Sequence, residues 1–312
     1  MNQKIKRNSQ NRVEELCNDR AVIDYIRTLN SFNSKRSMTY FVRCFIENFL
    51  KIDKEFTWEK INDALISHVV DVLLQEQQSP ATINTKLCAI KGCAKRLWIQ
   101  GRIEGKIYQI ISDISNVRGS RLSHGRMLSD NEVKRLFEYV DNQDSLKQIR
   151  DSAIFSVMIG TGLRRGEVAK LTTLNLFLDE KIPFLRVIGK GNKERQIPLP
   201  DFTFKRLKSW IEARGEHKGP LFIHILKNES LTNCALDGTR IYKICNEYVK
   251  KMGMKKWTPH DLRRTCASKL ISMGVDLITV RDYLGHSSIA TTQLYDKRSL
   301  SKLEKVAQNI NY

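Results

Sequence analysis

The sequence predicts a mainly α-helical protein of two domains, with one small antiparallel sheet, and three observations support this fold class. The chain has 312 residues, a length at which we expect two domains that each bury a core. Apolar residues recur at helical spacing through most of residues 13–111 and again in several segments after residue 127. Strand-forming sequence is concentrated in residues 183–199, which predicts the small sheet in the second domain.

The N-terminal part of the chain is predicted to be a small helical bundle with short connections. Residues 1–12 are polar and basic, and we expect a flexible tail there. Residues 13–112 contain the helical patterns and form the predicted first domain. The longest of these patterns covers residues 81–99. It starts after Pro80, which suits the first turn of a helix, and ends near Gly101.

A linker is predicted over residues 113–126, because its later part lacks apolar periodicity and contains glycine and serine. Arg118, Arg121 and Arg126 lie in this segment. Their guanidinium groups suit a strap that crosses DNA phosphates, so we predict that they bind DNA. Arginines in a linker also keep it soluble, and this second interpretation needs no DNA.

Residues 127–312 are predicted to form the second domain. Ser129 and Glu132 fit a capping box at the start of its first helix. Two β-rich segments within residues 183–199 flank a glycine-containing turn, which predicts a β-hairpin. Further helices are predicted over residues 148–161, 203–214, 238–252, 260–273 and 276–284.

The charge of the chain favours a nucleic acid partner. Lysine and arginine together number 53 against 34 acidic residues, which gives a formal net charge of +19. Such an excess attracts a polyanion and gains free energy when counterions are released. The sequence has no run of 18 apolar residues, and no apolar segment follows the basic N-terminus. We therefore expect no membrane partner and a cytoplasmic location.

The sequence gives no indication of a metal, cofactor or disulfide. Its seven cysteines are odd in number and include no CxxC pair, so we expect mostly buried, reduced thiols. Its six histidines include no HxxxH or HExxH pair, so a protein zinc site is not expected. The phosphate-loop, dinucleotide-binding and nucleophile-elbow motifs are absent too, which argues against ATP hydrolysis and against a dinucleotide cofactor.

A set of cationic, imidazole and phenol side chains lies at breaks between the predicted elements. Its members are Arg164, Lys190, His260, Arg263, His286 and Tyr295. Each residue alone is more often an ion-pair partner, a solvated side chain or a core anchor. Together, the cations and imidazoles can hold a phosphodiester and stabilise its pentacovalent transition state without a metal. A tyrosine hydroxyl suits the nucleophile, because a phosphotyrosine ester conserves the energy of the broken bond.

The same residues carry a resemblance to the tyrosine recombinases, also called the phage integrase family. The resemblance extends from about residue 13 to the C-terminus. It is strongest in four ordered motifs: TGLRRGEVAKL (161–171), VIGKGNKERQIPL (187–199), TPHDLRRTCASKLISMG (258–274) and LGHSSIATTQLYDK (284–297). Four motifs in this order and at this spacing are a specific signal.

The resemblance implies a role for each matched position. Arg164 and Arg263 would clamp the scissile phosphate. His260 would donate or accept a proton near the nucleophile, and Glu167 would support the site without taking part in the chemistry. On physical grounds, we expect Glu167 to orient His260 or Arg164 by a charged hydrogen bond. Tyr295 would form the 3′-phosphotyrosyl bond.

Two positions complete the implied set. Lys190 would protonate the leaving 5′ oxygen as a general acid, and His286 would hydrogen-bond the phosphate. Lys193 is the alternative general acid should the register of the hairpin differ, and otherwise a predicted DNA contact.

The resemblance also implies the architecture and the partners. The N-terminal helices would be a core-binding (SAM-like) bundle, and with the catalytic domain they would form a C-shaped clamp around double-stranded DNA. Paired inverted-repeat core sites would be brought together by a homotetramer, alone or with a second recombinase or an accessory protein. The C-terminal tail after Tyr295 has Leu300, Leu303, Val306 and Ile310 at helical spacing. That tail would pack on its own domain or dock on a neighbouring protomer.

Several functions remain open on the sequence. The implied activity is site-specific recombination through a Holliday junction, and details of the 258–274 motif favour an integrase of a mobile element. The chain length, in contrast, looks more like a Xer-type enzyme, which resolves chromosome or plasmid dimers, or like a simple recombinase. A type IB topoisomerase would share the chemistry without strand exchange, and a non-catalytic architectural protein would share only the DNA binding.

Overall fold

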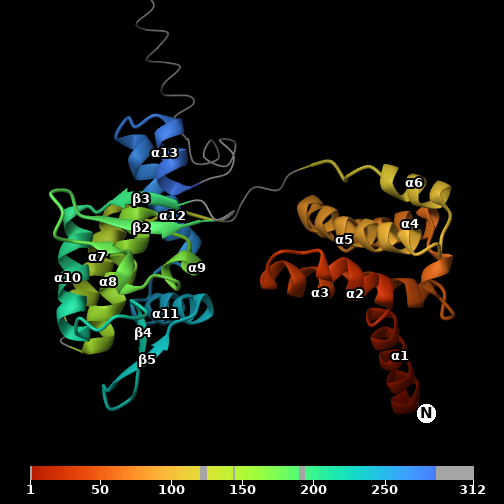
Figure 1. The fold of residues 1–312 in the computed structure, drawn as a ribbon, viewed down its shortest axis with the longest axis horizontal. Helices are drawn as coiled ribbons and strands as arrows, with labels where there is room; N and C mark the ends of the chain where they lie inside the picture. Colours follow the sequence, from red (N-terminus) through yellow and green to blue (C-terminus); the bar gives the residue numbers. More distant parts are fainter. Residues whose placement is uncertain (1, 120–124, 143–144, 190–193, 286–312) are drawn as a thin grey trace, which may run out of the picture. The chain divides into compact units, whose positions relative to one another are not determined.

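A computed structural model describes residues 2–119, 125–142, 145–189 and 194–285 of the chain, with side chains from residue 10 onward. Two compact units are present, residues 1–123 and 124–312, and their boundary falls inside the predicted linker. The described parts are mainly helical, with two small antiparallel sheets in the second unit, so the predicted fold class is confirmed (Figure 1).

The first unit consists of helices only within its described residues. They are α1 (Asn2–Cys17), α2 (Arg20–Arg27), α3 (Phe32–Ile52), the short 3-10 helix η1 (Trp58–Lys60), α4 (Asp63–Gln75), α5 (Pro80–Ile99) and α6 (Gly105–Asp113). Helix α5 begins at Pro80. The side chain of Ser79, which precedes it, caps the helix by accepting a hydrogen bond from Thr82 N at 3.2 Å. Its predicted start and end are therefore confirmed.

Residues 2–12 differ from the expected flexible tail, because they belong to the helix α1. The C-terminal half of α1 buries Val13 and Leu16 against the core of the unit. Once those turns are packed, adding residues to the helix costs little, since nucleation is the expensive step. Polar composition alone could not indicate this continuation.

The core of the first unit is aromatic and aliphatic. Phe45, Phe49, Phe56 and Trp58 are all at most 1% exposed, and neighbouring rings pack at tilted or edge-on angles. Helices α2 and α5 approach closely at Gly92, where a Cβ atom would lie 2.1 Å from the ring of Tyr25. This core makes a rigid helical scaffold.

The second unit is built around α8 (Leu146–Thr161), whose residues are nearly all buried. Around it pack α7 (Asp130–Asp141), α10 (Asp201–Arg214) and α12 (Pro259–Ser272) (Figure 1). The remaining helical elements are α9 (Arg165–Val168), η2 (Thr173–Asn175), α11 (Gly238–Lys251) and α13 (Leu277–Leu284). The helices that the sequence predicted in this unit are confirmed to within a few residues at their ends.

The sheet of the second unit contains the predicted hairpin. Strands β2 (Phe184–Ile188) and β3 (Glu194–Pro198) are antiparallel, and Leu185 pairs with Ile197. The two-residue strand β1 (Leu176–Phe177) adds to β2. A second hairpin, β4 (Ile223–Ile225) with β5 (Leu231–Ala235), was not predicted, because its strands are short and the second is largely exposed.

The remaining sequence predictions concern a helix cap, the cysteines, and membrane or metal features. The predicted capping box is confirmed, with Ser129 N donating to the Glu132 carboxylate at 2.9 Å. All seven cysteines are free, and Cys93, Cys245 and Cys266 are buried, whereas Cys88 and Cys234 are exposed. No helix in the described part of the chain is long and apolar enough to cross a membrane. The described residues also contain no cluster of potential metal ligands.

Candidate active site

Arg164 is presented by the break between α8 and α9. Gly162 ends α8 in the left-handed conformation with φ +64°, and the chain turns at once into the short helix α9. Arg164 caps this helix: its backbone N–H donates to Glu167 Oε2 at 2.8 Å, and its Nη1 donates to Oε1 at 3.2 Å. The Arg164 side chain is 43% exposed, so its guanidinium can still reach an anion in solution.

Glu167 is the charged centre of the site. Its side chain is only 10% exposed, and besides Arg164 it binds Arg195 Nη2 through Oε2 at 3.2 Å. Burial acts to raise the pKa of Glu167, but the Arg164 N–H and the positive charges of Arg195 and Arg164 outweigh it and lower the pKa. The ionised carboxylate thus holds the Arg164 guanidinium by a charged hydrogen bond, and its role in the reaction stays a prediction.

Arg263 is the buried cation of the site. It lies on α12 with 1% of its side chain exposed, and its Nη1 is 3.9 Å from Glu167 Oε2. Nη1 donates to the Gly162 carbonyl at 2.6 Å, and Nη2 donates to the Leu284 carbonyl at 2.9 Å. One guanidinium therefore joins the ends of α8 and α13. Arg164 Nη2 adds a hydrogen bond to the carbonyl of Gly285, which lies 121 residues later in the chain.

His260 lies one helical turn before Arg263. A capping box between Thr258 and Asp261 starts the helix. His260 is exposed as a residue, yet its imidazole is partly withdrawn from water. This burial is the main cause that lowers the pKa of His260, and the positive charges of Arg264 and Arg263 lower it further. The imidazole is therefore neutral at pH 7 and can accept a proton.

A cavity of about 400 Å³ brings these side chains together. Its lining consists of Arg164, Arg165, Tyr242, Thr258, Pro259, His260 and Arg263. Three of the predicted catalytic residues therefore share one cavity, although they come from segments nearly a hundred residues apart in the sequence. Guanidinium groups around a small cavity suit a phosphate oxyanion, which they bind by charged hydrogen bonds.

Other predicted site residues lie outside the described part of the chain. They are Lys190, Lys193, His286, Tyr295 and Arg121. The neighbouring residues are described: β2 ends at Ile188, β3 begins at Glu194, and Gly285 directly precedes His286. The roles of the five residues stay predictions.

The two described linker arginines differ. Arg118 is exposed. Arg126 instead donates from Nη1 to Glu132 at 2.8 Å and from Nη2 to the Lys255 carbonyl at 2.6 Å, and its backbone N–H donates to Asp261. These contacts join the start of the second unit to α7, to α12 and to the segment before α12. The predicted contact of Arg126 with DNA stays a prediction beside this structural role.

Two residues of the site were missed by the sequence analysis. Arg195 binds Glu167 from strand β3, and Arg165 lies over the ring of Tyr242, 5.5 Å from its centroid. A signal existed for Arg195, because it shares one face of the strand with the buried Ile197. A cation on the inward face of a strand needs a buried anionic partner.

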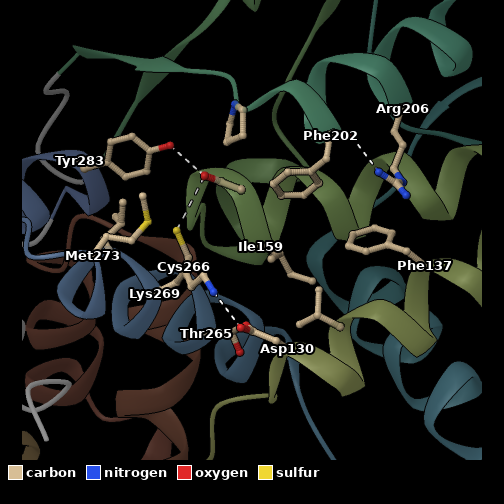
Figure 2. A pocket seen from close by; sticks show the side chains of 14 residues that line it. Asp130, Phe137, Ile159, Phe202, Arg206, Thr265, Cys266, Lys269, Met273 and Tyr283 are labelled. Atoms are coloured by element: carbon tan, nitrogen blue, oxygen red, sulfur yellow. Dashed lines mark hydrogen bonds and ion pairs between the residues drawn. The ribbon is translucent and has the colours of Figure 1, made fainter.

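A second cavity in the same unit is mostly apolar and has a volume of about 490 Å³. Figure 2 shows Phe137 and Phe202 on one side of it and Met273 and Tyr283 on the other. The Tyr283 hydroxyl donates to the Gly160 carbonyl at 2.8 Å. No predicted catalytic residue in the described part of the chain lines this cavity, so it is distinct from the cationic one.

Comparisons with known proteins identify the family and the fold. The sequence profile of the phage integrase family matches residues 126–301, more than half of the chain. A tyrosine recombinase XerC of Natranaerobius thermophilus is 30% identical over 83% of this chain and 86% of its own. A tyrosine recombinase XerA of Pyrococcus furiosus is also 30% identical, over 60% of this chain and 62% of its own, so the matched segment spans less than two thirds of that relative.

One solved structure illustrates the fold. The XerH site-specific recombinase, in a post-cleavage complex with its palindromic difH substrate, superposes with a TM-score of 0.67 at 24% identity. The match covers 87% of this chain and 79% of XerH. At this identity the likeness establishes the fold.

Proposed function

Because the chain belongs to the phage integrase family, we propose that it is a site-specific recombinase that cuts and rejoins double-stranded DNA. The observation that carries the proposal is the single cavity lined by Arg164, His260 and Arg263, with the ionised Glu167 bound to Arg164. These are the groups that a phosphodiester in its transition state requires. The proposed location is the cytoplasm, where the chain meets DNA.

The proposed reaction is a pair of transesterifications without metal or ATP. The Tyr295 oxygen attacks the scissile phosphorus, the bond to the 5′ oxygen breaks, and Lys190 donates a proton to that oxygen. Arg164 and Arg263 stabilise the charge on the non-bridging oxygens, with His286 as a further donor, and His260 accepts the tyrosine proton. The 5′ hydroxyl of the partner strand then attacks the phosphotyrosine, which exchanges strands and releases the enzyme.

A trapped covalent intermediate tests the proposal. On a suicide substrate nicked next to the cleavage site, the freed 5′ end diffuses away, so the wild-type chain should accumulate a protein–DNA adduct. Tyr295→Phe should form no adduct while it still binds the DNA. An adduct that persists in Tyr295→Phe would refute the nucleophile, and a wild-type chain that binds DNA without any adduct would favour an architectural protein.

The same assay series separates the remaining catalytic alternative. A type IB topoisomerase would relax supercoiled DNA without preference for a site, whereas a recombinase should join two core sites and produce a Holliday junction. The biological role divides between integration of a mobile element and Xer-type resolution of dimers. The HDLRRT sequence at 260–265 supports the first. Imperfect inverted repeats beside the gene, tested as substrates, distinguish the two roles.

A homotetramer is the proposed assembly, and the C-terminal tail is its proposed connector. The tail residues 299–312 lie outside the described part of the chain, and their apolar side chains recur at helical spacing. The apolar cavity of Figure 2, rimmed by the Lys269–Asp130 ion pair, suits such a segment from a neighbouring protomer. Deleting residues 299–312 should weaken pairing of two sites more than binding to one, in a gel-shift titration. Equal losses would assign the tail to its own domain.

A further inference from the structure

Arg195 is a nearly buried cation that the proposed reaction does not use. It lies on β3 with its side chain 14% exposed, on the same face as the buried Ile197. Its Nη2 donates to Glu167 Oε2 at 3.2 Å. Strand β3 and helix α9 are thus joined by an ion pair that little water can screen.

The Arg195 guanidinium also lies against the backbone at Gly285. A Cβ atom at this position would come within 2.8 Å of both Cζ and Nη1 of Arg195, and φ of Gly285 is +66°. Only glycine is therefore accommodated beside the guanidinium. The carbonyl of the same Gly285 accepts a hydrogen bond from Arg164 Nη2 at 3.3 Å. Arg195 and Arg164 thus contact the same carboxylate and the same glycine.

Because Arg164 and Arg195 share the carboxylate of Glu167, Arg195 affects how tightly that carboxylate holds Arg164. Glu167 offers Oε1 to Arg164 Nη1 and Oε2 to Arg195 Nη2, while Arg263 stays 3.9 Å away. Without Arg195, the negative charge of Glu167 would be balanced by Arg164 and, at longer range, by Arg263. A carboxylate that holds the guanidinium more tightly competes with a DNA phosphate for the same donors.

We propose that Arg195 is a positioning residue for the phosphate clamp: through Glu167 it holds Arg164 in place and keeps its guanidinium available to the scissile phosphate. This inference rests on the proposed recombinase function. It assigns Arg195 an effect on the rate of strand cleavage, exerted entirely through Glu167, and no direct contact with the DNA.

Single-turnover cleavage of the suicide substrate measures this effect. Arg195→Gln, which removes the charge but keeps a polar side chain, should slow adduct formation by about 10- to 100-fold, the range expected when a reacting group is misplaced. The dissociation constant for one core site should change by less than about threefold, since one buried ion pair lies outside the electrostatic contact with DNA. Arg195→Lys should recover part of the rate.

Arg186→Gln is the matched control. Arg186 lies on the adjacent strand β2, forms an ion pair with Glu194 at 3.2 Å, and is 42% exposed. Its loss should leave the cleavage rate within about threefold of wild type, as for an exposed ion pair. If both variants slow cleavage equally, a general weakening of the hairpin explains the result and the proposal fails.

A double-mutant cycle with Glu167→Gln is the decisive measurement. If Arg195 acts through Glu167, then Arg195→Gln should cost less than about threefold once Glu167 is neutral, because residues that act as a unit are not additive. Fully additive losses would overturn the proposal, as would a wild-type rate in Arg195→Gln. Should Arg195→Gln prove unstable by circular dichroism, the same cycle is run with Arg195→Lys. Failure of the wild-type chain to form any adduct would instead refute the recombinase function itself.

Discussion

The two units of the molecule bury different kinds of side chain. Among the described residues, the first unit buries one charged side chain, Lys86, within an aromatic and aliphatic core. The second unit buries five: Arg150, Asp151, Arg214, Asp261 and Arg263. A buried charge lowers stability unless hydrogen bonds compensate it, so a domain that keeps several must gain something else from them.

What the second unit gains is the fixed position of segments far apart in the chain. Arg263 joins the ends of α8 and α13, and Arg150 Nη1 reaches the carbonyl of Ile223 at 3.0 Å on β4. Lys86, in contrast, donates to Gln78 only eight residues earlier. Fixed cations are the means by which a protein stabilises a charged transition state. The second unit contains such cations in its described part, and they surround the candidate active site.

The largest effect is expected at Arg263, which holds distant segments together and is also proposed to bind the scissile phosphate. Arg263→Met removes two hydrogen bonds to carbonyls and one clamp guanidinium. It should lower the free energy of unfolding of the second unit by about 2–4 kcal/mol and slow cleavage by roughly 100- to 1000-fold. Urea unfolding followed by hydrogen exchange of α8 measures the first quantity, and adduct formation the second.

Arg164→Met is the matched control for this prediction. Arg164 is 43% exposed, so its loss should slow cleavage similarly but lower the free energy of unfolding by less than about 1 kcal/mol. Equal destabilisation by the two variants would show that burial does not separate structural from purely catalytic arginines in this unit.

A smaller effect is expected in the first unit. Lys86→Met replaces the buried ammonium by an apolar side chain of similar length and leaves Gln78 near the surface, where water can bind it. The free energy of unfolding should therefore change by less than about 1 kcal/mol, since an apolar replacement of a buried charge is often neutral. Hydrogen exchange in α5 measures it. A loss as large as that of Arg263→Met would remove the contrast between the units.

The same contrast explains how much the sequence could predict. Helix α5 and the capping box at Ser129 depend on residues close in sequence, and their patterns were sufficient. The pairing of Arg195 with Glu167 depends on the register of β3 against a helix 28 residues earlier, which no local pattern encodes. Its inward-facing position on the strand was visible, but the partner was not.

The linker gives a further example. Arg126 belongs to a segment whose composition predicted a DNA-binding strap, yet it forms hydrogen bonds with Glu132, Lys255 and Asp261 of the second unit. The composition of a segment indicates that it forms no helix, but it does not indicate which of its arginines forms an ion pair with a carboxylate elsewhere in the fold. Such long-range ion pairs require the tertiary structure.

The smallest expected effect is on the pH dependence of DNA cleavage. Because burial and the charges of Arg264 and Arg263 lower the pKa of His260, its imidazole should stay neutral to lower pH than an ordinary histidine. If His260 accepts the proton of Tyr295, cleavage should fall only as the pH drops through this lowered pKa. Arg264→Gln removes one positive charge and should raise the pKa of His260, so the acidic limb of the rate profile should move to higher pH. Arg186→Gln should not move it. An acidic limb that is unchanged in Arg264→Gln, or a rate that rises on acidification, would mean that His260 is not the proton acceptor.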